Sequence, residues 1–239
     1  MTETQTHVSP LPREGEVWYV SYGSNMAERR LTCYIEGGCP PGGSRANPGA
    51  RDRRPPRHSV GVQLPGSVYF AGRSPQWGGG VAFYDHETPG PAAARAYLVT
   101  AEQLADIAAQ EMYRVPDPDD PIEEIVLGGL DAALDGRHHL GPGRYETLVE
   151  VGRIGGAPML TFTSPHGIDH VDHSVPSDAY LAMMAEGLRE GHCWDDDEVD
   201  RYLGRLLRGR GPAAVPHTRP LDRSSQNPAG PLPSEVNSH

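Results

Sequence analysis

Apolar runs interrupted by glycine and proline predict a series of short strands along the chain. The first run, residues 17–21, is aromatic and β-branched, which is typical of a buried strand. Comparable runs follow at 60–63, 68–71, 81–84, 94–99, 145–153 and 159–163. No internal repeat accompanies them, so we expect the strands to share one core.

Helical periodicity is found between and after these strands. Thr100 and Gln103 form a Thr-x-x-Gln capping box, which predicts a helix start. A further helix is expected over 122–134. Two more follow Ser177 and the acidic residues 195–197, where apolar positions recur at helical spacing. Together these elements predict a mixed α+β fold, a β-barrel-like sheet with flanking helices.

Composition divides the chain into three parts. Residues 1–15 are polar and contain proline, and residues 209–239 are rich in Pro, Ser, Asn and Gly, so we expect both ends to be disordered. A single domain is expected over 16–208. Within it, residues 116–144 are interpreted as an insertion, and the Gly- and Pro-rich stretch 37–56 is predicted to be a long loop.

The charge of the 239-residue chain excludes several classes of protein. All 21 Lys and Arg positions are arginine, which excludes Schiff-base and P-loop chemistry because both need a lysine. The net charge of −11 argues against nucleic-acid binding. No apolar run approaches the roughly 18 residues of a membrane span. The three cysteines form no C-x-x-C pair, so neither a disulfide framework nor a zinc site is expected. We therefore expect a cytoplasmic protein without membrane partners. The sequence leaves its oligomeric state open.

Glu111 occupies an unusual position on the helix that begins after Thr100. Its apolar stripe passes through Leu104, Ile107 and Ala108, and the same spacing leads next to Glu111. A carboxyl group on a buried face has a raised pKa, which suits a proton acceptor and donor in an enzyme. The alternative is that Glu111 tilts outwards in the last turn and pairs with Arg114.

The tetrad Tyr22-Gly23-Ser24-Asn25 follows the first strand directly. Gly23 is able to adopt a positive φ, which would turn successive backbone N–H groups into an anion-binding nest. The side chain of Asn25 would stabilise the turn. The alternative is an ordinary turn between a strand and a loop.

Several motifs resemble the γ-glutamylcyclotransferase-like superfamily, in the family's order across most of 17–207. They are the segment 18–26 with its tetrad, the strand-like segments 69–72 and 77–83, the strand and helix of 94–111 ending at Glu111, and the helical segments 176–181 and 187–190. The sequence departs from the family pattern at Met112, where members usually have glycine, and in the insertion.

The resemblance implies the reaction and the site. The α-amine of a γ-glutamyl amide would attack its own γ-carbonyl, giving 5-oxoproline and a free amine, without a cofactor or metal. Glu111 would be the catalytic acid and base. The implied substrate-binding residues are Tyr22, Gly23, Ser24, Asn25, Trp77, Gly78, Gly79 and Tyr113.

A histidine cluster offers a competing hypothesis. His166, His170, Asp172 and His173 are four possible metal ligands within eight residues, as a metal-dependent amide hydrolase or deacetylase requires. Pro165, Gly167 and Pro176 predict a loop there, so a solvated polar loop is the alternative. The pair 138–139 is likewise expected to be an exposed loop.

Three further hypotheses remain to be weighed against the enzyme hypothesis. The domain would be a non-catalytic binding module if the fold were kept without the reaction. Cys33 and Cys39 have no visible His or Asp support for a nucleophilic role. The arginines within 45–57 would either grip an anionic ligand or form a solvated loop face, and the solvated loop is favoured.

Overall fold

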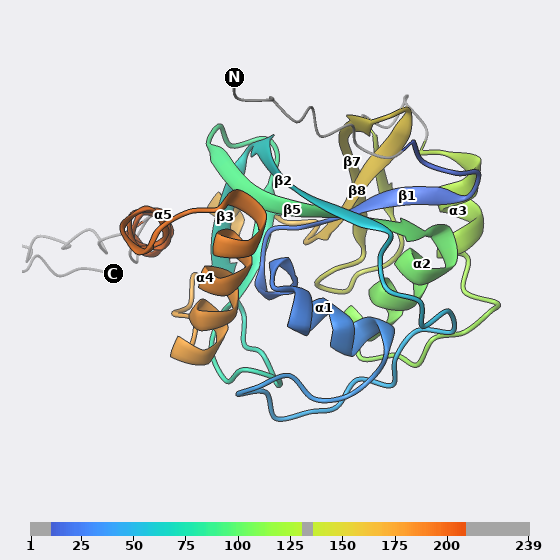
Figure 1. Cartoon of the computed structure of the whole chain (residues 1–239). Coiled ribbons are helices and arrows are strands. Elements are labelled where there is room, and N and C mark those ends of the chain that lie inside the picture. Colours follow the sequence, from blue (N-terminus) through green and yellow to red (C-terminus); the bar gives the residue numbers. More distant parts are fainter. Residues whose placement is uncertain (1–10, 131–135, 209–239) are drawn as a thin grey trace, which may run out of the picture.

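The structure, a computed structural model, describes residues 11–130 and 136–208 (Figure 1). Six strands form a mixed sheet in the order β2-β5-β1-β8-β7-β6, and β3 pairs with β4 in a separate hairpin. β1 runs antiparallel to β5 and parallel to β8. The strands are β1 (Glu16–Ser21), β2 (His58–Pro65), β3 (Ser67–Ala71), β4 (Val81–Asp85), β5 (Pro91–Thr100), β6 (Arg137–His139), β7 (Thr147–Ile154) and β8 (Ala157–Thr163). The predicted mixed α+β class is confirmed.

Strand β1 lies at the centre of the sheet and is buried on both faces. Trp18 and Val20 pack into one hydrophobic cluster, while Val17 and Tyr19 pack into another. Successive side chains of a strand point to opposite faces, so an apolar run without alternation needs cover on both sides. This explains why the first strand contains no polar position between Glu16 and Ser21.

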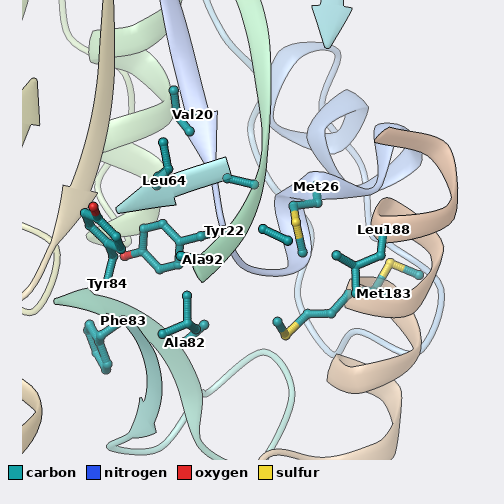
Figure 2. Packing of buried hydrophobic residues seen from close by; sticks show 14 of the residues in the cluster. Val20, Tyr22, Met26, Leu64, Ala82, Phe83, Tyr84, Ala92, Met183 and Leu188 are labelled. Carbon is teal, nitrogen blue, oxygen red and sulfur yellow. The ribbon is translucent and has the colours of Figure 1, made fainter. Parts of the chain in front are cut away.

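The first face is covered by α4 (Asp178–His192), α5 (Asp196–Arg208) and the β3–β4 hairpin. Figure 2 shows Met183 and Leu188 of α4 beside Met26, with Tyr22 and Phe83 further along the same cluster. Ser177 caps α4 by accepting a hydrogen bond from the backbone of the first turn, as a serine at this position favours.

The second face is covered by α1 (Glu28–Ile35), α2 (Ala101–Glu111) and α3 (Ile122–Gly128). Figure 1 shows α2 and α3 at the opposite end of the sheet from α4 and α5, whereas α1 lies beside α4 and is joined to it by the Arg29–Glu186 ion pair. The capping box of Thr100 and Gln103 is present, with both reciprocal hydrogen bonds made. The helix start predicted from the sequence is therefore confirmed.

The hairpin makes the arrangement barrel-like. The Thr163 side chain of β8 donates to the Tyr84 carbonyl of β4 at 2.6 Å and accepts from its amide at 3.1 Å. At the same end of the hairpin, the Gly66 amide donates to the Gly90 carbonyl at 2.7 Å, which joins the turn before β3 to the turn after β4. The hairpin thus connects to β8 and to the turn between β2 and β3, and its apolar side chains close the first cluster.

The structure differs from the sequence predictions at three elements. Helix α1 was not expected, because its N-cap is Ala27, whose side chain makes no capping hydrogen bond. The pair 138–139 lies in β6, paired with β7, where an exposed loop was expected. α3 ends at Gly128, short of the predicted 134, and the next residue, Gly129, has a φ of +80° that ends the helix. Residues 1–10, 131–135 and 209–239, which include most of the expected disordered ends, lie outside the described residues.

The turn after β1 is held in place by α4 and β5. A Cβ on Gly187 of α4 would lie 2.3 Å from the Cβ of Met26, so only glycine allows this approach. The Met26 carbonyl accepts hydrogen bonds from Arg95 at 3.0 Å and from the Tyr97 hydroxyl at 2.6 Å. Arg95 also pairs with Glu190 of α4. These contacts fix the entrance to α1, where the candidate site lies.

Among residues 11–130 and 136–208, none of the helices combines the length and apolar content that crossing a membrane requires.

Candidate active site

A cavity of about 410 Å³ opens between the turn after β1, the end of α2 and two loops. The Tyr22–Asn25 tetrad lines it together with Glu111, Tyr113 and Trp77. These residues come from three separate segments of the chain. The structure therefore brings together most of the residues that the sequence motifs predicted to share a site.

The tetrad leaves β1 and enters a short 3₁₀ helix, η1 (Ser24–Met26). Gly23 has φ −119° and ψ −146°, so the expectation of a positive φ was wrong. The position needs glycine for a steric reason, since a Cβ there would lie 2.7 Å from the Tyr180 hydroxyl. That hydroxyl accepts a hydrogen bond from the Ala82 amide at 3.1 Å, which ties the hairpin to the same point.

Asn25 connects the tetrad directly to Glu111. Its side-chain nitrogen donates to the Glu111 carboxylate at 2.7 Å and to the Tyr19 hydroxyl at 3.0 Å. Asn25 itself is buried. A short hydrogen bond from a fixed amide orients the carboxylate toward the turn after β1.

Glu111 is the last residue of α2 and is half-buried. Leu104, Ile107 and Ala108 of the same stripe are buried in the second cluster, as the periodicity predicted. The alternative in which Glu111 pairs with Arg114 was wrong. Arg114 lies instead 3.7 Å from the Asp120 carboxylate and 3.8 Å from that of Glu146.

The surroundings of Glu111 raise the pKa of its carboxyl above the usual value. Burial is the dominant cause, because it disfavours the charged form. The positive charge of Arg30 opposes this effect most strongly, followed by hydrogen bonds with Tyr34 and Asn25 and by the charge of Arg144. The result is a carboxyl that is held in place and can take up and release a proton.

Arginine side chains line the cavity to a degree that the sequence did not indicate. Arg30, Arg45, Arg114 and Arg144 all line it. Arg45 corrects the expectation that the arginines of 45–57 form only a solvated face. The other arginines of this loop bind protein carboxylates or carbonyls: Arg51 binds Asp106, Arg53 the Glu36 carbonyl, Arg54 Asp52 and Arg57 Glu16.

Arg30 is the innermost of these arginines, with an exposed fraction of 4%. It lies on α1 and donates to the Asn47 side chain and to the Tyr34 hydroxyl, both at 2.8 Å. Its guanidinium lies 4.2 Å from the centre of the Tyr34 ring and 5.7 Å from that of Trp77. The only sequence signal was its place five residues after Asn25.

Tyr113 lies at the outer part of the cavity, with 43% of its surface exposed. Its φ is +59°, a conformation that residues other than glycine rarely adopt. The guanidinium of Arg45 lies 4.8 Å from the ring centre, and that of Arg144 lies 5.5 Å from it. The residue with the left-handed backbone conformation is thus Tyr113 and not Met112. Met112 is the position at which the superfamily that the sequence resembles usually has glycine.

The loop after α1 is fastened by Gln110, the neighbour of Glu111. Its amide nitrogen donates to the Tyr34 carbonyl at 2.9 Å, and its oxygen accepts from the Gly49 amide and the Asn47 side chain at 3.3 Å each. The buried amide therefore holds one wall of the cavity. Sequence periodicity did not single out Gln110.

The glycines after Trp77 have a different role from the one predicted. Gly78 and Gly79 are not among the residues lining the cavity. Gly78 has φ +85°, and a Cβ on Gly79 would lie 2.6 Å from the Ser177 amide nitrogen. They shape the loop that brings Trp77 to the cavity and packs it against the start of α4.

The histidine segment does not have the geometry of a metal site. His166, His170 and Asp172 are exposed. His173 stacks on the Tyr69 ring, and its Nε2 lies 2.9 Å from the Ile168 carbonyl. Across residues 11–130 and 136–208, no three His, Cys, Asp or Glu side chains are grouped as metal ligands would be. The metal-dependent hydrolase hypothesis therefore has no support from the described residues.

The cysteines fit no nucleophilic role. Cys33 is buried on α1, and burial raises the pKa of its thiol, which disfavours the reactive thiolate. Cys39 is exposed in the following loop.

Comparisons with known proteins give weak likenesses. No protein-family model matches the chain. Histone deacetylase 5 of Arabidopsis thaliana is 29% identical over 215 residues, covering 80% of this chain and 31% of that protein. The chain thus spans under a third of that relative's length.

Two solved structures resemble the fold with a TM-score of 0.46 each. One is a γ-glutamyl cyclotransferase, 13% identical, with 84% of this chain and 91% of that chain covered. The other is an uncharacterized human protein, 14% identical, with the same coverage.

Proposed function

We propose that this protein is a γ-glutamyl cyclotransferase-type enzyme, which converts a γ-glutamyl amide to 5-oxoproline and a free amine. The observation that supports it best is the Glu111 carboxylate, which faces a cavity, is held by Asn25 and has a raised pKa. A cyclisation within one substrate needs one proton shuttle and a site that holds the substrate folded back on itself.

The proposed reaction balances with Glu111 as the only proton carrier. The α-amine nitrogen attacks the γ-carbonyl carbon, and Glu111 takes a proton from that nitrogen. The bond between the γ-carbon and the amide nitrogen then breaks, and Glu111 returns the proton to the departing nitrogen. No proton, electron or cofactor has to be supplied from elsewhere.

The positively charged wall supports this substrate class. A γ-glutamyl group carries an α-carboxylate, and Arg30 provides a buried guanidinium beside Glu111 that no protein carboxylate within the described residues pairs with at 4.0 Å or less. We assign the α-carboxylate to Arg30 and the tetrad. Such a contact would fix the α-amine near Glu111 and make the folded-back conformer productive.

The test is the release of 5-oxoproline from a panel of γ-glutamyl amides: an amino acid, a tripeptide and a polyamine derivative. Glu111→Gln keeps the shape of the side chain but carries no proton, so it should lower the rate at least about 100-fold. Glu102→Gln is the matched control, since it makes the same change at the opposite end of α2, outside the residues that line the cavity.

Two results would contradict the proposal. In one, the wild-type protein releases no 5-oxoproline from any member of the panel. In the other, the Glu111→Gln protein is as active as the Glu102→Gln protein. Dissociation constants measured with Glu111→Gln then show whether the cavity is a binding module without catalysis.

A further inference from the structure

The cavity carries more positive charge than the protein itself neutralises. Arg30, Arg45 and Arg144 line it, and no carboxylate of the described residues lies within 4.0 Å of these guanidinium groups. Glu111 is the only acidic residue among those lining the cavity. This excess lies in a chain whose net charge is −11, so it is a local feature and not a consequence of overall composition.

The unpaired charges lie at two depths. Arg30 is buried, and its hydrogen bonds go to the neutral Asn47 and Tyr34 side chains. Arg45 is exposed and Arg144 is half-buried, and both lie against Tyr113 at the outer part of the cavity. A ligand that pairs with Arg30 and also with the outer arginines, Arg45 and Arg144, needs two separated negative groups.

Tyr113 gives the outer pair a defined geometry. Its positive φ places the ring beside Arg45, from the loop after α1, and Arg144, from the loop before β7. Arg144 is further held by donating to the Arg73 carbonyl at 3.2 Å. A guanidinium stacked against a ring keeps its N–H edges available, and these edges match the two oxygens of a carboxylate.

We propose that Arg45, Arg144 and Tyr113 form a second anion subsite, which binds a carboxylate on the leaving group. The inference rests on the proposed function and narrows it: the substrate is a γ-glutamyl amide of an amino acid or peptide, not of a polyamine. A polyamine would bring ammonium groups against two unpaired guanidinium groups, and like charges at this range repel.

The test compares two ligands that differ in one charge, γ-glutamylglycine and γ-glutamylglycinamide. They have nearly the same size, but only the first carries the outer carboxylate. We expect wild-type kcat/KM to be about tenfold higher for γ-glutamylglycine, with the ratio falling as salt is added. Arg45→Gln with Arg144→Gln should bring the ratio close to one. Each single variant should give an intermediate ratio, which keeps the test valid if the double variant does not fold.

Arg54→Gln is the matched control, because Arg54 lies in the same loop as Arg45 but pairs with Asp52 and does not line the cavity. Its substrate ratio should equal that of the wild type. A wild-type ratio near one, or a ratio that survives in the double variant, would overturn the second subsite.

Measurements of ligand binding test the second subsite independently of the proposed reaction. The dissociation constants of the same two ligands, measured by calorimetry with Glu111→Gln, report the subsite without turnover. Tighter binding of γ-glutamylglycine supports the subsite even if the wild type releases no 5-oxoproline, in which case only the reaction is wrong. Equal dissociation constants, or binding of neither ligand, overturn the subsite.

Discussion

Arg95 and Arg30 are both buried, and both lie close to the turn after β1, yet their surroundings differ. Arg95 pairs with Glu190 and Glu28 and also donates to Ser59 and to the Met26 carbonyl. Arg30 has only neutral partners and faces a cavity. Where the protein supplies the carboxylates, the arginine joins β5 to α1 and α4. Where the protein supplies no carboxylate, as at Arg30, the positive charge stays available to a ligand.

The largest effect on stability should come from Arg95→Met. The change leaves Glu190 without its buried cation and removes one of the two hydrogen bonds to the Met26 carbonyl. Removing one member of such a network costs about 3 kcal/mol of unfolding free energy. Urea denaturation followed by circular dichroism measures it. A loss below about 1 kcal/mol would mean that Arg95 does not fasten the turn and that the contrast with Arg30 is wrong.

Gly187→Ala tests how closely α4 packs against the turn after β1. The new methyl group would overlap Met26, and overpacking of this kind costs about 1–3 kcal/mol. The matched control is Gly204→Ala in α5, where the nearest atom to a new Cβ is the flexible end of Arg208 at 3.2 Å. That variant should be unchanged or stabilised by up to about 1 kcal/mol. Equal effects of both changes would show that α4 does not press on the turn.

Arg30→Met should have a small effect on stability and a clear effect on the pH dependence of activity. Replacing a buried charge that lacks an ionic partner by an apolar side chain should change the unfolding free energy by about 1 kcal/mol or less. The Arg30 charge lowers the pKa of Glu111, so its removal should raise that pKa further. The acid limb of the kcat/KM profile should then move to higher pH.

Arg29→Met is the control for that profile, because Arg29 also lies on α1 but is exposed and pairs with Glu186 of α4. An unchanged acid limb in Arg30→Met would mean that the Arg30 charge does not influence the pKa of Glu111.

The smallest effect concerns Glu111 and the stability of the folded protein. Its pKa is raised in the folded state, so the wild type loses stability as the pH rises through the unfolded glutamate value of about 4.3 towards the folded one. Glu111→Gln lacks this loss. Its melting temperature should match the wild type in acid and exceed it near neutral pH. Glu102→Gln should show no such pH-dependent gain, and a gain equal in both variants would contradict the raised pKa.

Local sequence signals predicted much of the fold. The capping box at Thr100, the apolar stripe of α2 and the buried first strand each depend on neighbouring residues, and each is present in the structure. Helix α1 was missed because its signal is weak: it is short and has no side-chain cap. The mixed α+β class was predictable because strand and helix periods differ.

The candidate site was predicted only in part. The tetrad and Glu111 carry motifs, so both were found, although the reason for glycine at position 23 was steric and not conformational. Arg30, Arg45 and Arg144 come from a helix and two loops far apart in sequence, and their convergence depends on tertiary structure. The close spacing of the histidine segment was misleading, since a loop does not impose a shared direction on its side chains.

Helix α2 carries three attachments within its last two turns: Asp106 holds Arg51, Gln110 holds the loop after α1, and Glu111 meets Asn25. Successive helical residues differ in direction by about 100°. Adding or deleting one residue between Thr100 and Asp106 would therefore turn all three side chains away from their partners at once. A change in the length of α2 should therefore be tolerated far less than a substitution at Glu102, which is the one residue of this helix besides Glu111 that is not buried.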